Sequence, residues 1–528
     1  MKRRLDRPVG KSRLSVWPCL VLVLYMLIMG LYAAGRFDGN WAETDSATFT
    51  LYIRDLVNQG RLVPPSTPVY PNGYAYQAIS TFIVSLTGLE VETLQQWIYP
   101  LFAALVVLPA WITYRELTGS PLGATLSTLL LFIQPEFLFV ILRSSHEKFT
   151  RTLMLICLFL LARSISQRHS SRKAAVYIAL FFFTTFAFIT SNLLWANSFI
   201  FAIAIVYVLG AIVGKLKPNV KVWNNHLTNR FRYIIPVCLV LVYVFTFFVY
   251  PPARHNFLVL QNTWDGIAEL FLAPQTESAD IYVAYSYVSF GWVNLPTYLI
   301  LSIANWIMLA ASFVIWLRQG WNWVWHSTVP KNQAAWLLWL FYTAFAIQGA
   351  LAVISDASGA FSSNLQLRLF PSFAMIAVAM IGAALAEWRP QRYARAISLG
   401  FAAALFCISI LSLLKATNEP LFSNKWGFYH PGELVALQWG DTHLNATELW
   451  TEFDERLVVA YQMAIGSPAN RFTSGISPSA RDIMLSSVVR LRGRRIDQPL
   501  PVPPDALQVY DNGTAQLYHL RPRTPYQR

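Results

Sequence analysis

Residues 16–34 read VWPCLVLVLYMLIMGLYAA, a run of nineteen residues without a single charge. A helix of this length rises about 28 Å, which is close to the roughly 30 Å hydrocarbon core of a bilayer. The rest of the chain repeats the pattern, because 55% of its 528 residues are hydrophobic and only 13% are charged. Soluble domains carry about 25% charged residues. The sequence therefore predicts an all-α polytopic membrane protein and excludes a soluble globular chain.

Ten further apolar runs follow the first one. The predicted spans lie at about residues 16–34, 97–114, 121–142, 149–166, 174–190, 193–213, 233–250, 297–317, 334–354, 368–386 and 396–414. One more apolar stretch, from Tyr76 to Leu86, is too short to cross a bilayer and is interpreted as an interfacial or re-entrant helix. The prediction is about eleven transmembrane helices.

The Lys and Arg residues between these runs set the predicted orientation. With the N-terminus in the cytoplasm, the inner segments carry 21 of them and the outer loops before residue 415 carry eight. Positively charged loops stay on the cytoplasmic side. Two long loops, residues 35–96 and 251–296, and the tail from residue 415 are therefore expected outside. The net charge of +14 follows from anchoring loops and a basic tail, and it needs no nucleic-acid partner.

Two parts of the chain are expected to fold separately. Residues 1–414 form the transmembrane domain, and residues 415–528 form a soluble exterior domain. In this tail, residues 509–514 read VYDNGT, with Asn-Gly between apolar runs. That dipeptide in that setting is the strongest short signal for a β-hairpin. The tail is therefore predicted to be a small α/β domain.

Acidic residues on the outer face are the first candidates for chemistry. Residues 41–61 read WAETDSATFTLYIRDLVNQGR, so Asp45 follows the first span directly. Residues 46–58 of this stretch are amphipathic and are expected to lie along the lipid interface. The loop at 143–148, RSSHEK, is also outside and very short. Its Glu147 is expected to approach Asp45 within roughly 3–6 Å, where the two could hold Mg²⁺ or Mn²⁺ and clamp a substrate phosphate.

Each of these residues also has a simpler interpretation. Asp45 is then a solvated loop residue, and Glu147 is the partner of Lys148 or Arg151 in an ordinary ion pair. His146 is then a loop residue that only makes hydrogen bonds. The sequence alone leaves both interpretations open.

Two arginines complete the outer face. Arg368, within the stretch NLQLRLFP at 364–371, opens the tenth span, where a positive charge opposes the helix dipole. A planar guanidinium suits phosphate, so Arg368 is predicted to bind the substrate, with an interfacial anchor as the alternative. Arg143 is interpreted as a side chain that reaches out to the lipid headgroups.

The first outer loop resembles that of the catalytic subunits of oligosaccharyltransferases, which are membrane glycosyltransferases of the GT-C class. The matching residues, in order along the loop, are Asp45, Tyr52, Arg54, Gly60, Tyr70, Pro71 and Gly73. The resemblance implies a GT-C-like fold, a catalytic Asp45 and a substrate-binding role for Arg54.

The resemblance also implies roles for residues later in the chain. The family's second outer loop carries an acidic pair with one residue between, and here that place reads Ser145-His146-Glu147. Glu147 matches and is implied to be catalytic and metal-binding, together with Asp45. Ser145 departs from the pattern, which implies either that His146 serves as a compensating metal and substrate ligand or that the enzyme works without metal. Arg368 is similar to the family's late arginine.

The predicted function is transfer of a sugar or glycan from a polyprenyl phosphate or diphosphate donor. The acceptor is a protein, lipid or glycan on the non-cytoplasmic side. An oligosaccharyltransferase-like enzyme and a monosaccharide transferase of the protein-mannosyltransferase type both fit, because the tail lacks the family's Trp-Trp-Asp-Tyr-Gly string. The alternatives are a non-enzymatic membrane scaffold and a transporter or flippase of lipid-linked substrates. A transporter should show charges inside its spans and two related halves.

Overall fold

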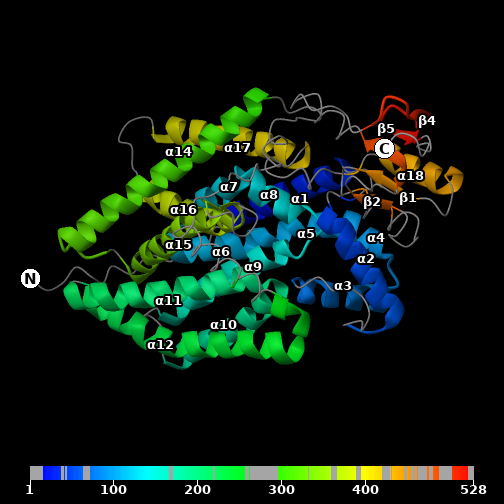
Figure 1. The fold of residues 1–528 in the computed structure, drawn as a ribbon. Coiled ribbons are helices and arrows are strands. Elements are labelled where there is room, and N and C mark those ends of the chain that lie inside the picture. Colours follow the sequence, from blue (N-terminus) through cyan, green and yellow to red (C-terminus); the bar gives the residue numbers. More distant parts are fainter. Residues whose placement is uncertain are drawn as a thin grey trace, which may run out of the picture.

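The computed structural model describes residues 16–36, 41, 44–62, 72–165, 171–217, 220–255, 261, 295–330, 332–357, 365–387, 394–418, 429, 431–444, 449–452, 457, 461, 472–474, 480–486 and 502–520. These residues form a bundle of long helices with a small domain of helix and sheet at one end (Figure 1). The predicted outer loop 251–296 lies mostly outside the described residues.

The bundle is built from long helices and from shorter ones joined end to end. The long ones are α1 (Trp17–Arg36), α9 (Glu147–Ile165), α10 (Ser171–Ser191), α11 (Leu193–Leu216), α12 (Lys221–Val244), α14 (Leu295–Gly320), α15 (Gln333–Ala357), α16 (Leu365–Glu387) and α17 (Ala394–Asn418). The shorter ones are α4 (Val91–Thr93), η1 (Leu94–Ile98), α5 (Tyr99–Phe102), η2 (Ala103–Val106), α6 (Val107–Thr118), α7 (Pro121–Phe132), α8 (Pro135–Leu142), η4 (Phe245–Val249), η5 (Pro251–Arg254) and η7 (Trp321–Trp325).

The predicted class is confirmed: the chain is a multi-pass membrane protein. Among the described residues, eight helical stretches are long and apolar enough to cross a membrane, or nine if the bent pair α7–α8 counts as one span. Each of the eleven predicted spans coincides with helix, and α9 and α14 occupy the two predicted spans beyond those nine.

The exposed face of α1 shows why these helices need lipid as a solvent. Leu20, Leu24 and Leu31 are 49%, 58% and 56% exposed and recur at helical spacing on one face. Met26 and Ala33, on the other face, are fully buried in the bundle. An apolar stripe of this length is unfavourable in water, so this outer face of α1 contacts hydrocarbon.

One predicted span is broken in the structure. The sequence prediction treats residues 121–142 as a single span, but the helix stops at Phe132 and restarts at Pro135 with a bend of 83°. Gln134 has extended backbone angles because the residue before a proline is disfavoured in the helical region. The break turns α8 so that it leads into α9 through a short connection.

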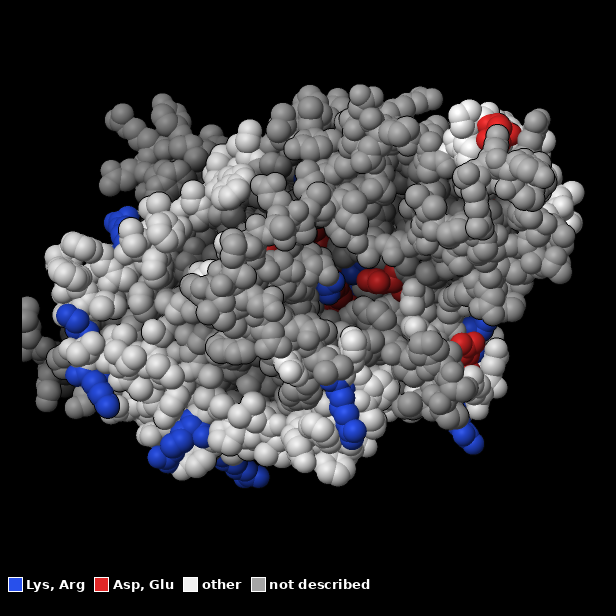
Figure 2. Space-filling view, viewed as in Figure 1, with Lys and Arg blue, Asp and Glu red and all other residues white. Residues whose placement is uncertain are grey.

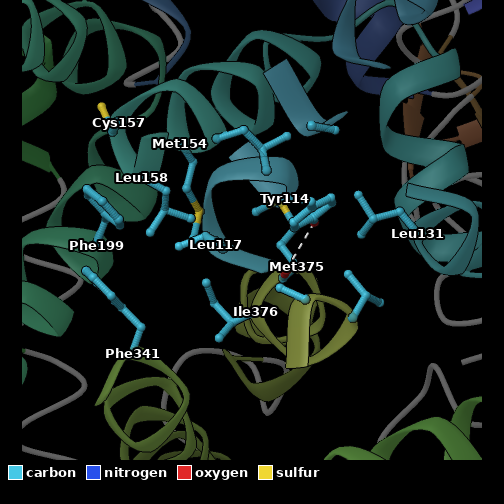
Figure 3. Packing of buried hydrophobic residues seen from close by; sticks show 14 of the residues in the cluster. Tyr114, Leu117, Leu131, Met154, Cys157, Leu158, Phe199, Phe341, Met375 and Ile376 are labelled. Carbon is cyan, nitrogen blue, oxygen red and sulfur yellow. Dashed lines mark hydrogen bonds between the residues drawn. The ribbon is translucent and has the colours of Figure 1, made fainter. Parts of the chain in front are cut away.

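The middle of the bundle is a tightly packed apolar core. Figure 3 shows Tyr114 and Leu117 of α6 beside Met154 and Leu158 of α9 and Met375 of α16. The Tyr114 hydroxyl donates to the carbonyl oxygen of Met375 at 3.0 Å, so its polar end is satisfied inside the core. These contacts fix α9 against α6 and α16.

Helices α7 and α16 approach so closely that they require glycine. A Cβ on Gly382 would lie 2.0 Å from Oγ of Ser127 and 2.7 Å from the carbonyl oxygen of Gly123. The Ser127 hydroxyl donates to the carbonyl oxygen of Val378 across the same interface at 3.1 Å. Small residues with interhelical hydrogen bonds are typical of packing in membranes, where apolar surface alone gives little driving force between helices.

Two shorter helices, α2 (Thr44–Gln59) and α3 (Tyr74–Thr87), lie at one end of the bundle (Figure 1). At 14 residues α3 is about 21 Å long and too short to span a bilayer, as predicted. The predicted lipid contact of residues 46–58 is wrong for the buried face of α2. Phe49 and Ile53 pack with α3, and Ala47 packs with the C-terminal domain.

The C-terminal domain combines α18 (Pro431–His443) with five strands. These are β1 (Leu449–Glu452), β2 (Phe472–Ser474), β3 (Ala480–Ser486), β4 (Leu507–Asp511) and β5 (Ala515–His519), in the sheet order β2-β1-β3-β5-β4. β1 pairs in parallel with β2 and β3, and the β3–β5 and β4–β5 pairs are antiparallel. The predicted hairpin is confirmed, with Gly513 at φ 81° in its turn.

Candidate functional site

The candidate site lies at the connection between α8 and α9. Arg143 has extended backbone and ends α8, and Glu147 begins α9. Between them, Ser144 donates its hydroxyl to the carbonyl oxygen of Gln95 in η1, which fixes the turn against that helix. The first turn of α2 brings Asp45 to the same place from a distant part of the sequence.

Arg143 lies between the two predicted acidic residues. Its Nη1 is 3.6 Å from Oδ2 of Asp45, and its Nη2 donates to Oε2 of Glu147 at 2.9 Å. The Arg143 side chain is only 1% exposed, whereas Glu147 is 17% exposed and Asp45 32%. The structure thus brings Asp45 and Glu147 to one guanidinium. The interpretation of Arg143 as a headgroup anchor is wrong, because the side chain is buried inside the protein.

Glu147 is held in its ionised form by this arrangement. Burial alone would raise its pKa, but the positive charges of Arg143 and Arg151 outweigh burial and lower the pKa to about 2. A carboxylate close to two positive charges, one of which also donates a hydrogen bond to it, is strongly stabilised. Glu147 is therefore negatively charged throughout the physiological range.

His146 is buried and its imidazole is already bonded. Its Nε2 lies 2.8 Å from the amide nitrogen of Asn192, and its ring packs 5.1 Å from the ring of Phe49. Because an amide nitrogen donates, Nε2 accepts, and the neutral ring carries its proton on Nδ1. The nitrogen Nε2 is thus occupied by the protein itself.

Arg368 acts on this site through its charge. Burial, as the largest cause, and the charges of Arg143, Arg151 and Arg368 together lower the pKa of His146 to about 4, against the opposing charge of Glu147. Arg368 itself is exposed in the first turn of α16. The predicted phosphate-binding residue thus lies near enough to His146 to influence it and is open to the outside.

A third arginine, Arg151 of α9, packs against residues of α11 and α16 next to the site. Its guanidinium lies 3.7 Å from the centre of the Trp195 ring, and its Nη1 donates to Oγ of Ser372 in α16 at 3.1 Å. Its charge helps to keep Glu147 ionised. Arg151 therefore connects α9, α11 and α16 behind the acidic residue.

Two other predicted contacts are made elsewhere. Arg54 forms an ion pair with Glu92 of α4 at the protein surface. It lies nine residues after Asp45 on α2, which is about 13 Å along the helix axis. Lys148, the alternative partner for Glu147, instead donates to the carbonyl oxygen of Tyr99. The structure therefore does not bring Arg54 or the Lys148 ammonium to the Arg143 guanidinium.

Solved structures of an archaeal enzyme share this architecture. The oligosaccharyltransferase of Archaeoglobus fulgidus in its apo form matches at a TM-score of 0.51 and 11% identity, over 88% of this chain and 65% of that one. The oligosaccharyltransferase AglB from the same organism, in complex with an inhibitory peptide and a dolichol-phosphate, matches at a TM-score of 0.50 and 11% identity, over 89% of this chain and 69% of that one.

The chain has the fold of an oligosaccharyltransferase. The resemblance predicted from the first outer loop is thereby confirmed at the level of fold. The chain spans about two thirds of the archaeal enzyme's length, 65% in the apo structure. A third structure of that enzyme, in complex with Zn and sulfate, matches at a TM-score of 0.43 and 10% identity, over 88% of this chain and 68% of that one. No protein-family model matches the sequence, and no curated protein matches it.

The residues at the site do not fit a divalent cation in this oligosaccharyltransferase-like fold. The predicted ligands are Asp45, Glu147 and His146. The Arg143 guanidinium contacts both carboxylates, and Nε2 of His146 is bonded to Asn192. Within the described part of the chain, no group of three or more His, Cys, Asp or Glu residues is placed to hold a metal ion.

Charged groups gather in a hollow on one face of the molecule. Figure 2 shows acidic and basic side chains together near the middle of that face, whereas most other Lys and Arg residues in the view lie singly at its edges. Charges are scarce in this chain, at 13% of residues. Ionisable groups that cluster inside a membrane protein indicate a functional site.

The contacts of Arg143 and Arg151 at this site were not predicted from the sequence. A signal was present, because Arg143, Glu147 and Arg151 recur every four residues. That spacing would place side chains on one face of a continuous helix. It was not decisive, since α9 begins only at Glu147 and Arg143 has extended backbone before it.

Proposed function

We propose that this chain transfers a sugar or glycan from a polyprenyl phosphate or diphosphate donor to an acceptor on the non-cytoplasmic side of the membrane. The observation that carries the proposal is the Asp45–Arg143–Glu147 bridge, assembled from α2 and α9 in an oligosaccharyltransferase fold. A site of ionised carboxylates and arginines at the end of a bundle suits an ionic headgroup whose tail lies in lipid.

Asp45 is the proposed residue that contacts the acceptor. It is the most exposed member of the bridge, at 32%, and its contact with Arg143 is the longer one, at 3.6 Å. A carboxylate that is oriented but not enclosed is suited to accept a proton or hydrogen bond from an attacking hydroxyl or amide. Glu147, more enclosed, would hold Arg143 in place.

Arg368 is the proposed phosphate-binding residue. It is exposed at the outer start of α16 and acts on the same buried histidine as Arg143. A guanidinium there would bind the donor phosphate and balance the charge that develops as it leaves. The archaeal enzyme's dolichol-phosphate complex supports a polyprenyl phosphate as the class of ligand.

The side of the reaction follows from the distribution of charge. The proposed inner segments carry 21 Lys and Arg, and this excess supports a site, an α2 and a C-terminal domain outside the cytoplasm. We infer that the acceptor is a protein, lipid or glycan of that compartment.

Transport of a lipid-linked substrate is the second candidate, and one observation favours it. The carboxylate oxygens of Glu136 in α8 are buried, as is Lys415 in α17, so two ionisable groups lie inside the bundle. Such groups mark substrate paths in transporters. The product distinguishes the two functions, because transport leaves the glycosyl–phosphate bond intact and transfer breaks it.

The test is a donor screen in membranes that contain the full chain. Polyprenyl monophosphate and diphosphate sugars would be supplied with an extract of exported proteins and glycans, and release of the free polyprenyl phosphate would be measured. The proposal expects release above that of membranes without the chain, on one class of donor. Movement of intact donor across the bilayer without release would support transport instead.

A further inference from the structure

We propose that Arg143 supplies the central positive charge of this site, so that the chain works without the divalent cation that two carboxylates would otherwise hold. The inference rests on the proposed function where transfer activity is measured. The measurements of cation binding do not depend on that function.

The first ground is that the Arg143 guanidinium lies where it contacts both carboxylates. Nη1 and Nη2 of Arg143 contact Asp45 and Glu147 at 3.6 and 2.9 Å, so one planar group joins carboxylates from α2 and α9. A hard cation would need carboxylate oxygens at about 2.0–2.6 Å from the same point. The guanidinium and the ion therefore compete for one position, and the guanidinium is covalently part of the chain.

The second ground is the local balance of charge. Two carboxylates, Asp45 and Glu147, are surrounded by the guanidinium groups of Arg143 and Arg151, with Arg368 acting on the adjoining His146. The negative charge is already neutralised before any ion binds. A divalent cation added here would be repelled by these arginines, which cannot lose their protons.

The third ground is the chemistry of the neighbouring side chains. Ser145 is buried, and its Oγ has no hydrogen-bond partner among the described residues, so this position brings a neutral hydroxyl and no further carboxylate. His146 accepts from Asn192 through Nε2. Hard cations such as Mg²⁺ and Mn²⁺ prefer several anionic or carbonyl oxygens, and the turn at 143–147 offers few.

Arg143 acts in this account as a positioning residue. It orients Asp45 toward the acceptor and keeps Glu147 ionised, and it provides the fixed charge that an ion would provide in a metal-dependent site. Because Arg143 is 1% exposed, its ion pairs are screened only weakly by salt in the medium.

The test begins with cation binding by the purified full-length chain in lipid nanodiscs. Free Mn²⁺ would be followed by electron paramagnetic resonance at millimolar concentrations. We expect no bound Mn²⁺ on the wild-type chain. Arg143→Ala exposes Asp45 and Glu147 to each other. This variant should bind one Mn²⁺ per chain, at least about tenfold more tightly than the wild-type chain does. The double variant Arg143→Ala/Asp45→Asn should lose that binding.

A matched control is Arg54→Ala, which removes an arginine from the Glu92 ion pair on the same side of the molecule. It leaves a single carboxylate and should bind no Mn²⁺. Tight binding of one Mn²⁺ by the wild-type chain, removed by Asp45→Asn, would overturn the proposal. So would a folded Arg143→Ala variant that gains no binding.

Transfer activity provides the second measurement. Wild-type transfer should change less than about twofold in excess EDTA, whereas Arg143→Ala should lose at least about 10²-fold and regain part of it with Mn²⁺. Reversible loss of wild-type activity in EDTA would overturn the inference. If Arg143→Ala does not fold, the wild-type binding and EDTA measurements decide. If no transfer is found on any donor, the proposed function fails while the binding measurements still decide this inference.

Discussion

At the scale of single residues, Arg143 gives the two acidic side chains different environments. Glu147 makes the shorter contact and is more enclosed, whereas Asp45 makes the longer one and is more exposed. The two carboxylates should therefore respond differently when each is neutralised.

Glu147→Gln should destabilise the protein more than Asp45→Asn. Removing one partner of a buried ion pair leaves the other charge uncompensated, which costs about 3–5 kcal/mol for full burial and less here because Glu147 is 17% exposed. Asp45→Asn should cost less, about 1 kcal/mol, because Asp45 is 32% exposed and its contact with Arg143 is the longer one at 3.6 Å. Thermal unfolding of both variants in the same detergent measures the difference. Equal melting temperatures would contradict the burial argument.

His146 should make stability depend on pH in a narrow range. Its folded pKa is lowered to about 4 from an ordinary value near 6.5. The unfolded chain then binds more protons between these values, so stability is complete above about pH 6.5 and is lost as pH falls toward 4. The difference amounts to about 3 kcal/mol at most.

His146→Gln keeps a hydrogen-bonding side chain but cannot take up a proton. It should flatten the dependence of melting temperature on pH between about 4 and 6.5. Wild type and variant would be compared in the same buffers, so that the other histidines contribute equally. An unchanged pH profile in the variant would show that His146 is not the group that titrates.

Asp45 and Glu147 are predicted as candidate residues from the sequence, but Arg143, which contacts both of them, is not. An acidic residue after a span can be recognised locally. An arginine before a helix at the membrane rim looks the same whether it points to headgroups or inward. Burial of Arg143 depends on α2, about 90 residues earlier in the chain. No local pattern carries that information.

At the scale of helices, the apolar runs predicted nearly every membrane element. Run length and composition are enough to predict a span. The bend at Pro135 and the burial of one face of α2 were not predicted, because they depend on what the helix packs against. The proline was visible in the sequence, but a proline can bend a membrane helix or leave it nearly straight.

The close approach of α7 and α16 gives a prediction at this scale. Gly382→Ala would place a methyl group within contact distance of Ser127 and of the Gly123 backbone, and overpacking of this kind costs about 1–3 kcal/mol. The matched control is Gly349→Ala in α15, where a Cβ meets nothing within 4 Å. The control should leave stability unchanged or raise it by up to about 1 kcal/mol. Unfolding temperatures that fall equally for both would contradict the close contact.

At the scale of the whole molecule, the end of the bundle that carries α2 also carries the C-terminal domain (Figure 1). Ala47 of α2 is fully buried together with Leu437, Met484 and Leu517 of that domain. Asp45, two residues before Ala47, is therefore positioned by the domain as well as by the bundle. The sequence predicted a separate tail but could not show that the tail packs against the helix of the site.

Membrane orientation is the prediction that belongs to this scale. The excess of Lys and Arg on one set of loops predicts a cytoplasmic N-terminus and an exterior C-terminal domain. A reporter that is active only outside the cytoplasm, fused after Arg528, should be active. A cytoplasmic reporter at the same position should be silent. The opposite pattern would place the Arg143 bridge on the cytoplasmic side and contradict the proposed function.

We propose that Asp45, oriented by Arg143, takes part in transfer from a lipid-linked donor. The direct measurement is the rate of polyprenyl phosphate release by Asp45→Asn in membranes, normalised to the amount of folded chain. The account predicts a fall of at least about 10²-fold, whereas Asp55→Asn, a neutralised acid on the same helix α2, should keep nearly the wild-type rate. Wild-type release by Asp45→Asn would contradict the account, because Asp45 would then be only a solvated residue at the rim.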